Sequence, residues 1–227
     1  MEVHNTNVNY IQYGRGKDIV LLHGWGQNIE MMQFLGDPLS NSYRITILDF
    51  PGFGESEEPQ EVWNITDYAN MLHELLTKLK IENPTLIGHS FGGRVAIRYA
   101  AQYPVEKLVL FGSPCVITKK KQPLKVKALK AAKKLPGMKK IAEIAKNYIG
   151  SRDYKAASPM MRNILVQVVN EDLSDYAKKI TAPTLLIWGD QDTEAPVEEA
   201  KLLEKLLKDG ALIILPGTHY AYLENLN

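Results

Sequence analysis

A serine stands between two glycines in the segment Gly88-His-Ser-Phe-Gly92, where a short apolar run gives way to a helical pattern. A strand that turns into a helix through Gly-x-Ser-x-Gly is typical of a nucleophile elbow, in which the serine takes a strained backbone conformation and exposes its hydroxyl. The backbone N–H of Phe91 would then lie at a helix start, where developing negative charge is stabilised. The pattern also recurs by chance, so this interpretation needs a base, an acid and a second oxyanion donor elsewhere in the chain.

The histidines are the candidates for the base that a serine hydroxyl needs before it can attack. His4 and His73 fall in a strand region and within a helical pattern, and both are expected at the surface. His23 precedes a glycine-rich turn, and His89 adjoins the elbow serine, from which its side chain diverges. His219 lies in a loop after the last predicted strand, where nothing else explains it, so it is the predicted base.

The acid that orients the base is sought in the loop Trp188-Gly-Asp-Gln-Asp-Thr-Glu-Ala-Pro196. Its three carboxylates, Asp190, Asp192 and Glu194, follow a predicted strand and precede a helix, where acidic residues often only cap the helix. The order serine, acid, base along the chain nevertheless favours one of the three as the partner of His219.

The composition indicates an ordinary globular protein. The 227 residues suit one domain, or one domain with an insertion; 45% are hydrophobic and the formal net charge is +1. No apolar run approaches about 18 residues, so no membrane span is expected, and the first residues lack the basic and apolar regions of a signal peptide. The single cysteine, Cys115, excludes an internal disulfide and is expected to be a buried thiol, which fits a cytoplasmic location.

Apolar runs and helical spacings alternate along most of the chain, which predicts a parallel sheet covered by helices on both faces. Residues 8–14 alternate, end on a glycine, and are predicted as a strand of an opening hairpin. The other predicted strands are the run before Gly88 and residues 18–24, 43–49, 105–112, 183–189 and 211–216. The predicted helices cover residues 31–35, 68–79 and 196–207 and the segment after Gly92.

The strands stop between residues 115 and 181, which predicts an all-helical insertion, or cap, in a core domain formed by residues 1–114 and 182–227. Apolar residues at helical spacing mark one amphipathic helix at 141–149 and another at 161–169. Ser158 and Pro159 precede the second helix as its cap and first turn.

The candidate residues are expected to meet at one edge of the sheet. Ligands of open parallel sheets bind beyond the carboxyl ends of the strands. The predicted strands place His23, Asp49, Ser90, Asp192 and His219 at those ends.

At these residues the chain resembles the α/β-hydrolase fold family. The similarity extends over nearly the whole length, in five blocks that have the order and spacing of that family. The blocks are His23-Gly-Trp-Gly26, Asp49-Phe-Pro-Gly-Phe-Gly-Glu-Ser56, Gly88-His-Ser-Phe-Gly-Gly93, Trp188-Gly-Asp-Gln-Asp192 and Gly217-Thr-His219. The resemblance implies an α/β fold with a mostly parallel central sheet flanked by helices and an inserted all-helical cap.

The resemblance also implies roles for individual residues. It places the nucleophile at Ser90, the base at His219, the acid at Asp192, and the oxyanion donors on the backbone N–H groups of Trp25 and Phe91.

Two further features follow from the same resemblance. Asp49 and Ser56 match a block that is mostly turn architecture in the family, so they are left out of catalysis. Members of the family continue after the histidine loop into a final helix that packs on the sheet, whereas eight residues follow His219 here. If that helix is absent, apolar sheet surface is expected to be uncovered.

The serine at the elbow indicates acyl transfer, because family members that open epoxides or displace halides carry aspartate there. We therefore predict a cytoplasmic serine hydrolase that cleaves small carboxylic esters through an acyl-enzyme intermediate, with no cofactor or metal. Two alternatives stay open. One is a carbon–carbon bond or thioester hydrolase with the same triad, and the other is a ligand-binding receptor of the same fold without turnover.

The near-neutral total charge conceals a strongly basic segment. Residues 116–155 contain thirteen Lys or Arg and only two acidic residues, Glu143 and Asp153. The segment is either a solvated helix face whose Lys stems cover apolar surface or a docking face for an acidic protein. The turn His23-Gly-Trp-Gly-Gln-Asn28 is similar to that of pimeloyl–carrier-protein methyl ester esterases, which implies an acidic carrier protein as partner. Nucleic acid is not expected, because the basic stretch lacks interleaved aromatic residues.

Overall fold

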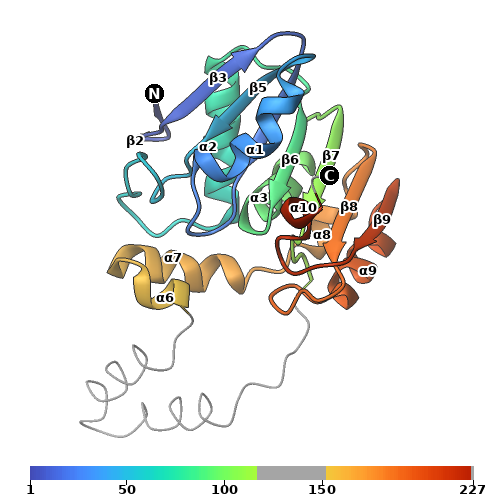
Figure 1. Ribbon diagram of the computed structural model, residues 1–227. Coiled ribbons are helices and arrows are strands. Elements are labelled where there is room, and N and C mark those ends of the chain that lie inside the picture. The colour runs from blue at the N-terminus through green and yellow to red at the C-terminus, as the bar shows by residue number, and fades with distance from the viewer. Residues whose placement is uncertain (117–151, 226–227) are drawn as a thin grey trace, which may run out of the picture.

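The computed structural model describes residues 1–116 and 152–225. Within them the chain forms a sheet of seven strands in the order β3-β5-β4-β6-β7-β8-β9 (Figure 1). Every neighbouring pair is parallel except β3 with β5, so the prediction of a mostly parallel sheet is confirmed. The strands are β3 (Tyr10–Gly14), β4 (Lys17–Leu22), β5 (Tyr43–Leu48), β6 (Thr85–His89), β7 (Lys107–Phe111), β8 (Thr184–Gly189) and β9 (Gly210–Leu215).

The pairing predicted for residues 8–14 was wrong. The opening hairpin is formed by the short strands β1 (Glu2–Val3) and β2 (Thr6–Asn7), whereas β3 pairs antiparallel with β5. The next strand along the chain, β4, is occupied on both sides by β5 and β6. Because a strand has only two hydrogen-bonding edges, β3 must lie at the edge of the sheet beyond β5.

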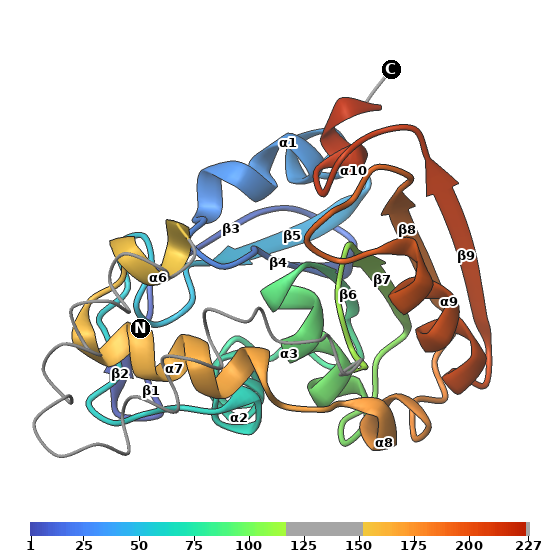
Figure 2. The same ribbon diagram turned by 90° about the horizontal axis from the view of Figure 1, so that it is seen from below.

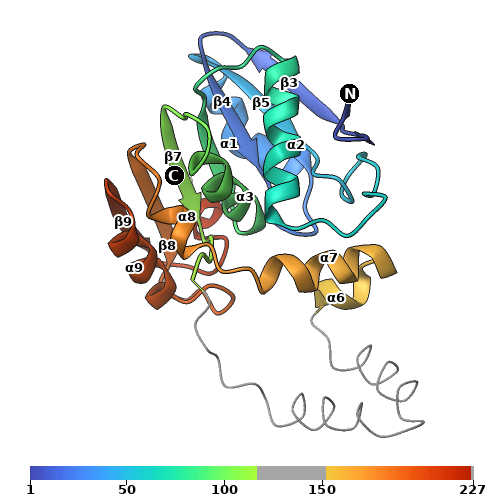
Figure 3. The same ribbon diagram turned by 180° about the vertical axis from the view of Figure 1, so that it is seen from behind.

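Helices cover both faces of the sheet, and the alternation of side chains along each strand supplies both interfaces. In β4, Val20 and Leu22 join the core shared with α2 (Ile65–Lys78) and α3 (Phe91–Ala100). The intervening Ile19 and Leu21 pack on the side of α1 (Ile29–Leu39). Figure 1 shows α1 and α10 (Ala221–Glu224) in front of the sheet, and Figure 3 shows α2 and α3 on the opposite face. Helix α9 (Val197–Leu206) packs against β8 and β9.

Between β7 and β8 the described residues form the helices α6 (Arg152–Ala156), α7 (Pro159–Val169) and α8 (Ser174–Ala177). Helix α7 confirms the amphipathic helix predicted at 161–169, and the Ser158 hydroxyl accepts the backbone N–H of Met161 as its cap, at 3.1 Å. The helix predicted at 141–149 lies outside the described residues, so the limits 115–181 of the cap stay a prediction. Helices α6 and α7 lie beneath the sheet in Figure 1 and in front of it in Figure 2.

The buried side chain of Arg94 connects α3 to the chain just after β7 and to the carboxyl-terminal end of α7. Its guanidinium donates to the backbone carbonyl of Pro114, just after β7, and to those of Val168 and Glu171 at the end of α7. Arg94 is 5% exposed, and burial lowers its pKa. Three carbonyl oxygens thus surround a buried cation within one turn of the elbow.

The carboxyl-terminal part of the structure leaves some sheet surface uncovered. Helix α10 has four residues, and the side chains of Ile213 and Ile214 on the edge strand β9 remain 45% and 44% exposed.

Cys115 is fully buried, as predicted, and burial raises the pKa of its thiol to about 12. No helix in the described ranges is long and apolar enough to cross a membrane; a cytoplasmic location stays a prediction.

We predict that Arg94→Met destabilises the protein, because the three carbonyls of Pro114, Val168 and Glu171 lose their donor in a buried site. The expected loss is roughly 3 kcal/mol in the free energy of unfolding, measured by urea denaturation. The control Arg15→Met removes an exposed arginine and should change that free energy by about 0.5 kcal/mol at most. Equal stability of the two variants would show that the Arg94 contacts contribute nothing.

Candidate active site

The elbow predicted at Ser90 is present in the structure as a strained turn. Ser90 joins β6 to α3 with φ 51° and ψ −111°, outside the regions that residues with a β-carbon favour. A β-carbon on Gly88 would lie 2.6 Å from the backbone nitrogen of Gly93, and one on Gly92 would collide with the carbonyl oxygen of Leu22. The glycines of the motif are therefore required by the close approach of strand and helix.

The two N–H groups assigned to an oxyanion site are unpaired within the part of the chain that the structure describes. They belong to Phe91, the first residue of α3, and to Trp25, in the turn after β4. His23 holds that turn: its Nδ1–H donates to the carbonyl of Gly24 at 2.7 Å, while its Nε2 accepts the N–H of Phe50 at 2.9 Å. Complete burial lowers the pKa of His23 to about 4, and these contacts need the neutral imidazole.

The structure brings the predicted base and one of the three candidate acids together. Nδ1–H of His219 donates to Oδ2 of Asp192 at 2.7 Å, and both side chains are buried. The other carboxylate oxygen of Asp192 accepts the backbone N–H groups of Glu194 and Ala195. Because this acid is held from both sides, the pairing fixes one orientation of the imidazole.

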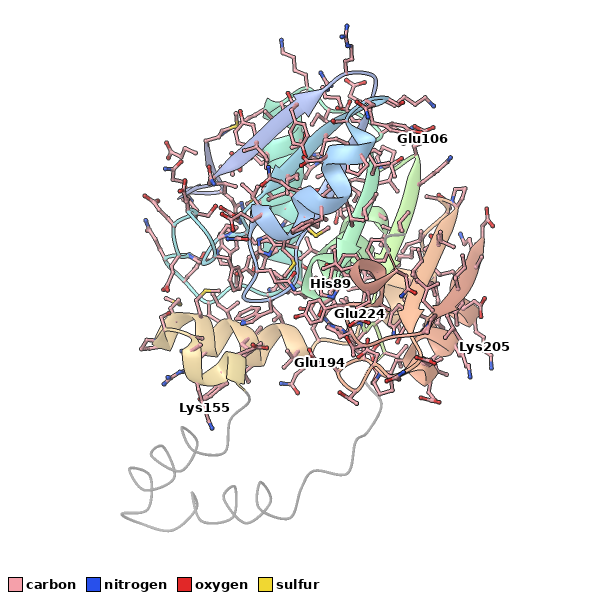
Figure 4. The ribbon with its side chains drawn as sticks, in the orientation of Figure 1. His89, Glu106, Lys155, Glu194, Lys205 and Glu224 are labelled. Carbon is pink, nitrogen blue, oxygen red and sulfur yellow. The ribbon has the colours of Figure 1, made fainter. Side chains whose placement is uncertain are left out.

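The two remaining carboxylates of the loop have other surroundings. Asp190 accepts the backbone N–H of Gly217 at 2.9 Å, which ties the acid loop to the base loop. Glu194 has a side chain that is 65% exposed, and its Oε2 lies 3.7 Å from Nε2 of His219. Figure 4 shows Glu194 near the end of α7.

Ser90 and His219 face the same space. Both line a cavity of about 320 Å³, walled on one side by Leu165, Val168 and Val169 of α7. Both also line a second cavity of about 960 Å³, which extends along the turn of Trp25. A substrate whose reacting atom sits at Ser90 thus has room on two sides. Within the described ranges, no three His, Cys, Asp or Glu side chains gather as metal ligands would.

Asp49 and Ser56 stabilise the turn after β5 through hydrogen bonds. The Asp49 carboxylate accepts the N–H of Ile29 at the start of α1 and the N–H of Glu55. The Ser56 hydroxyl donates to the backbone carbonyl of Asp49 at 2.7 Å. These contacts account for both residues without a part in the chemistry.

Gly112 is a site residue that the sequence analysis did not single out. It follows β7 with φ +49°, and a β-carbon there would lie 2.9 Å from Nδ1 of His219 and 3.3 Å from Oδ2 of Asp192. The only signal in the sequence was a glycine at the end of a predicted strand. The pair of His219 and Asp192 thus packs directly on the backbone of Gly112.

Comparisons with known proteins agree with the fold described above. A family model described as alpha/beta hydrolase fold matches residues 18–141, more than half of the chain. The AB hydrolase superfamily protein YisY of Bacillus subtilis is 28% identical over 93% of this chain and 88% of its own length. A pimeloyl-[acyl-carrier protein] methyl ester esterase of Aliivibrio fischeri is 24% identical over 95% and 91%. The solved structure of an esterase from Exiguobacterium antarcticum superposes with a TM-score of 0.75, at 27% identity, over 96% of this chain and 91% of that one.

We predict that Gly112→Ala slows the chemistry at Ser90, because the new methyl group must displace the His219 imidazole. A misplacement of about 1 Å costs on the order of 100-fold in rate, measured as the rate at which a fluorophosphonate labels Ser90. Asn83→Ala is the matched control, since Asn83 has the same φ of 49° in an exposed turn remote from the site. Labelling of both variants at the wild-type rate would contradict the predicted packing.

We also predict that stability falls on acidification through His23 and His89. Burial lowers their pKa values to about 4 and about 3, below the ordinary 6.5. Above pH 6.5 both are neutral in the folded and unfolded states, so stability is unaffected. Below it only the unfolded state takes up these protons, and the free energy of unfolding should drop by about 3 kcal/mol between pH 6.5 and about 5.

Urea denaturation at several pH values measures this acid dependence. The variant His89→Gln removes one of the two groups, so the loss over this range should be about half that of the wild type. A free energy of unfolding that is constant over the range would contradict the neutral, buried state of both imidazoles.

Proposed function

Because the chain belongs to the α/β-hydrolase fold family, we propose that it cleaves small carboxylic esters through an acyl-enzyme intermediate. The observation that carries the proposal is the buried pair of His219 and Asp192, which opens onto the same cavity as Ser90. The names of its relatives support the choice of ester bonds, since they include esterases and lipases.

In the proposed first step, Ser90 Oγ bonds to the ester carbonyl carbon and Nε2 of His219 takes the hydroxyl proton. The carbonyl oxygen becomes an oxyanion, which the backbone N–H groups of Trp25 and Phe91 stabilise. Asp192 keeps the proton on Nδ1, so that Nε2 is free to act as base, and its charge stabilises the imidazolium. The bond to the alcohol oxygen then breaks, and the alcohol leaves with the proton from Nε2.

Deacylation repeats these steps with water. His219 takes a proton as the water oxygen bonds to the acyl carbon, and Ser90 leaves with that proton as the carboxylic acid is released. Ser90 lines two cavities, which we propose hold the acyl and alcohol parts. Helix α7 lines the smaller one, so we propose that the cap selects one part of the substrate.

An acidic carrier protein that delivers the acyl group is a further part of the proposal. Its support is the basic composition of residues 116–155 and the name of the Aliivibrio fischeri relative. Most of these basic residues lie outside the described ranges. Docking of this kind weakens as salt rises, so turnover of a carrier-linked ester should fall with salt while turnover of the free ester does not.

Ser90→Ala tests the proposed chemistry, because it removes the nucleophile. We expect hydrolysis of p-nitrophenyl acetate, butyrate and octanoate to fall to background, since losing such a serine costs on the order of 10⁶-fold in turnover. A burst of p-nitrophenol in the wild type, absent from the variant, would report the acyl-enzyme. The control Ser40→Ala changes a serine at the far end of α1 and should hydrolyse all three esters at the wild-type rate.

The outcomes separate the proposal from its alternatives. Equal rates for the wild type and Ser90→Ala would refute a serine mechanism. Turnover of thioesters or carbon–carbon substrates, with none of oxygen esters, would favour the alternative hydrolases. Binding of a ligand without turnover of any of these would favour a receptor.

A further inference from the structure

His89, the residue before Ser90, is almost wholly buried and contacts two loops of the site. Its Nε2 lies 3.1 Å from the backbone carbonyl oxygen of His219, and its Nδ1 lies 3.2 Å from Oε1 of Gln27. Its ring also packs against those of Tyr220 and Tyr222, and Figure 4 shows it in the interior beside α10. Both ring nitrogens thus face partners other than Ser90, and the side chain contacts the loop of the base.

The same imidazole touches the loop that carries an oxyanion donor. Oε1 of Gln27 accepts the backbone N–H of Gly24 at 2.8 Å, and a β-carbon on Gly24 would lie 2.8 Å from Nδ1 of His89. Nε2–H of Gln27 donates to the hydroxyl of Tyr220 at 3.4 Å. Gly24 directly precedes Trp25, so one buried side chain lies between the oxyanion turn and the base loop.

The chemistry of these contacts selects one tautomer of His89. Burial, and then the neighbouring His219, lower the pKa of His89 to about 3, so the ring is neutral near pH 7. A neutral imidazole has a single N–H, whereas both of its nitrogens face oxygen acceptors. Within the described ranges the backbone carbonyl of His219 accepts from no donor other than His89, while Gln27 Oε1 already accepts from Gly24. The proton therefore belongs on Nε2.

We propose that His89 is a positioning residue for the reaction: its Nε2–H holds the carbonyl of His219 and thereby fixes the catalytic imidazole relative to Ser90. The inference rests on the proposed function, since His89 affects the reaction only by positioning the base His219. Asp192 fixes the far side of the His219 ring, and His89 fixes its backbone. With both contacts, residue His219 is held at its ring and at its backbone. Without the contact from His89, the loop of His219 can shift. The shift then either moves Asp192 as well or lengthens the distance between His219 Nδ1 and Asp192 Oδ2.

Two substitutions of His89 separate its two contacts. In His89→Gln the side-chain amide reaches the position of Nε2 and can still donate to the carbonyl of His219. In His89→Asn the amide reaches only the position of Nδ1, so the contact with Gln27 survives and the contact with His219 is lost. The proposal expects His89→Gln to retain the rate within about threefold and His89→Asn to lose about 10- to 100-fold.

The rate to be measured is labelling of Ser90 by a fluorophosphonate, together with kcat and KM for p-nitrophenyl butyrate. The loss in His89→Asn should fall on kcat and on the labelling rate, with KM changed by less than about threefold, because the substrate cavities are intact. His73→Asn is the control: that histidine stacks on Tyr103, outside the site, and its variant should match the wild type. Equal rates for the Gln and Asn variants of His89 would overturn the proposal.

A measurement on the unmodified protein keeps the proposal falsifiable if His89→Asn fails to fold. Long-range ¹H–¹⁵N spectra at pH 7 assign the proton of each neutral imidazole, and the proposal requires His89 to carry it on Nε2. A proton on Nδ1 would overturn it. Labelling also separates the two proposals: an unlabelled Ser90 in the wild type would refute the proposed function, whereas a labelled wild type with an equally reactive His89→Asn would refute only the role of His89.

Discussion

The close approach of β6 and α3 is the constraint on which the rest of the site depends. No β-carbon fits at Gly88 or Gly92, and the chain can turn there only with Ser90 at a positive φ. A strained residue of this kind persists because the surrounding sheet over-determines it. Strand β6 has a parallel strand on each side, so the turn is held at the centre of the sheet. The loop after β4 lies on one side of this turn, and the loops after β8 and β9 lie on the other.

Three buried histidines have different roles around that turn, and the groups that face their rings explain the difference. His23 and His89 are kept neutral, so each can donate with one ring nitrogen while the other stays unprotonated. His219 has a carboxylate, Asp192, against its Nδ1. That buried charge is what can support a cation on this ring during a reaction. The imidazoles of His23 and His89 are thus suited to form fixed hydrogen bonds with backbone groups, and that of His219 is suited to transfer a proton.

Helix α7 is joined to the rest of the fold by the same helix that begins at the elbow. Arg94 occupies the position one turn after Ser90 and donates to the carbonyl of Pro114, just after β7, and to those of Val168 and Glu171 at the end of α7. A buried cation is costly unless its hydrogen bonds are satisfied, and here three backbone oxygens accept from the guanidinium. Helix α7, which walls the smaller cavity, is therefore placed by a residue of the elbow helix.

The sequence by itself determined the seven strands of the large sheet and the helices α1, α2, α3, α7 and α9, because apolar runs and helical spacings report burial along a single strand or helix. It identified the elbow at Ser90 and, through the order of its blocks, the pair of Asp192 and His219. The tertiary structure alone decided that β3 pairs with β5, that Gly112 lies beneath the acid–base pair, and that His89 faces the carbonyl of His219. Each of these is a contact between residues far apart in the chain, and such contacts depend on the order of strands in the sheet. No periodicity within one segment records that order, so only the folded arrangement could reveal them.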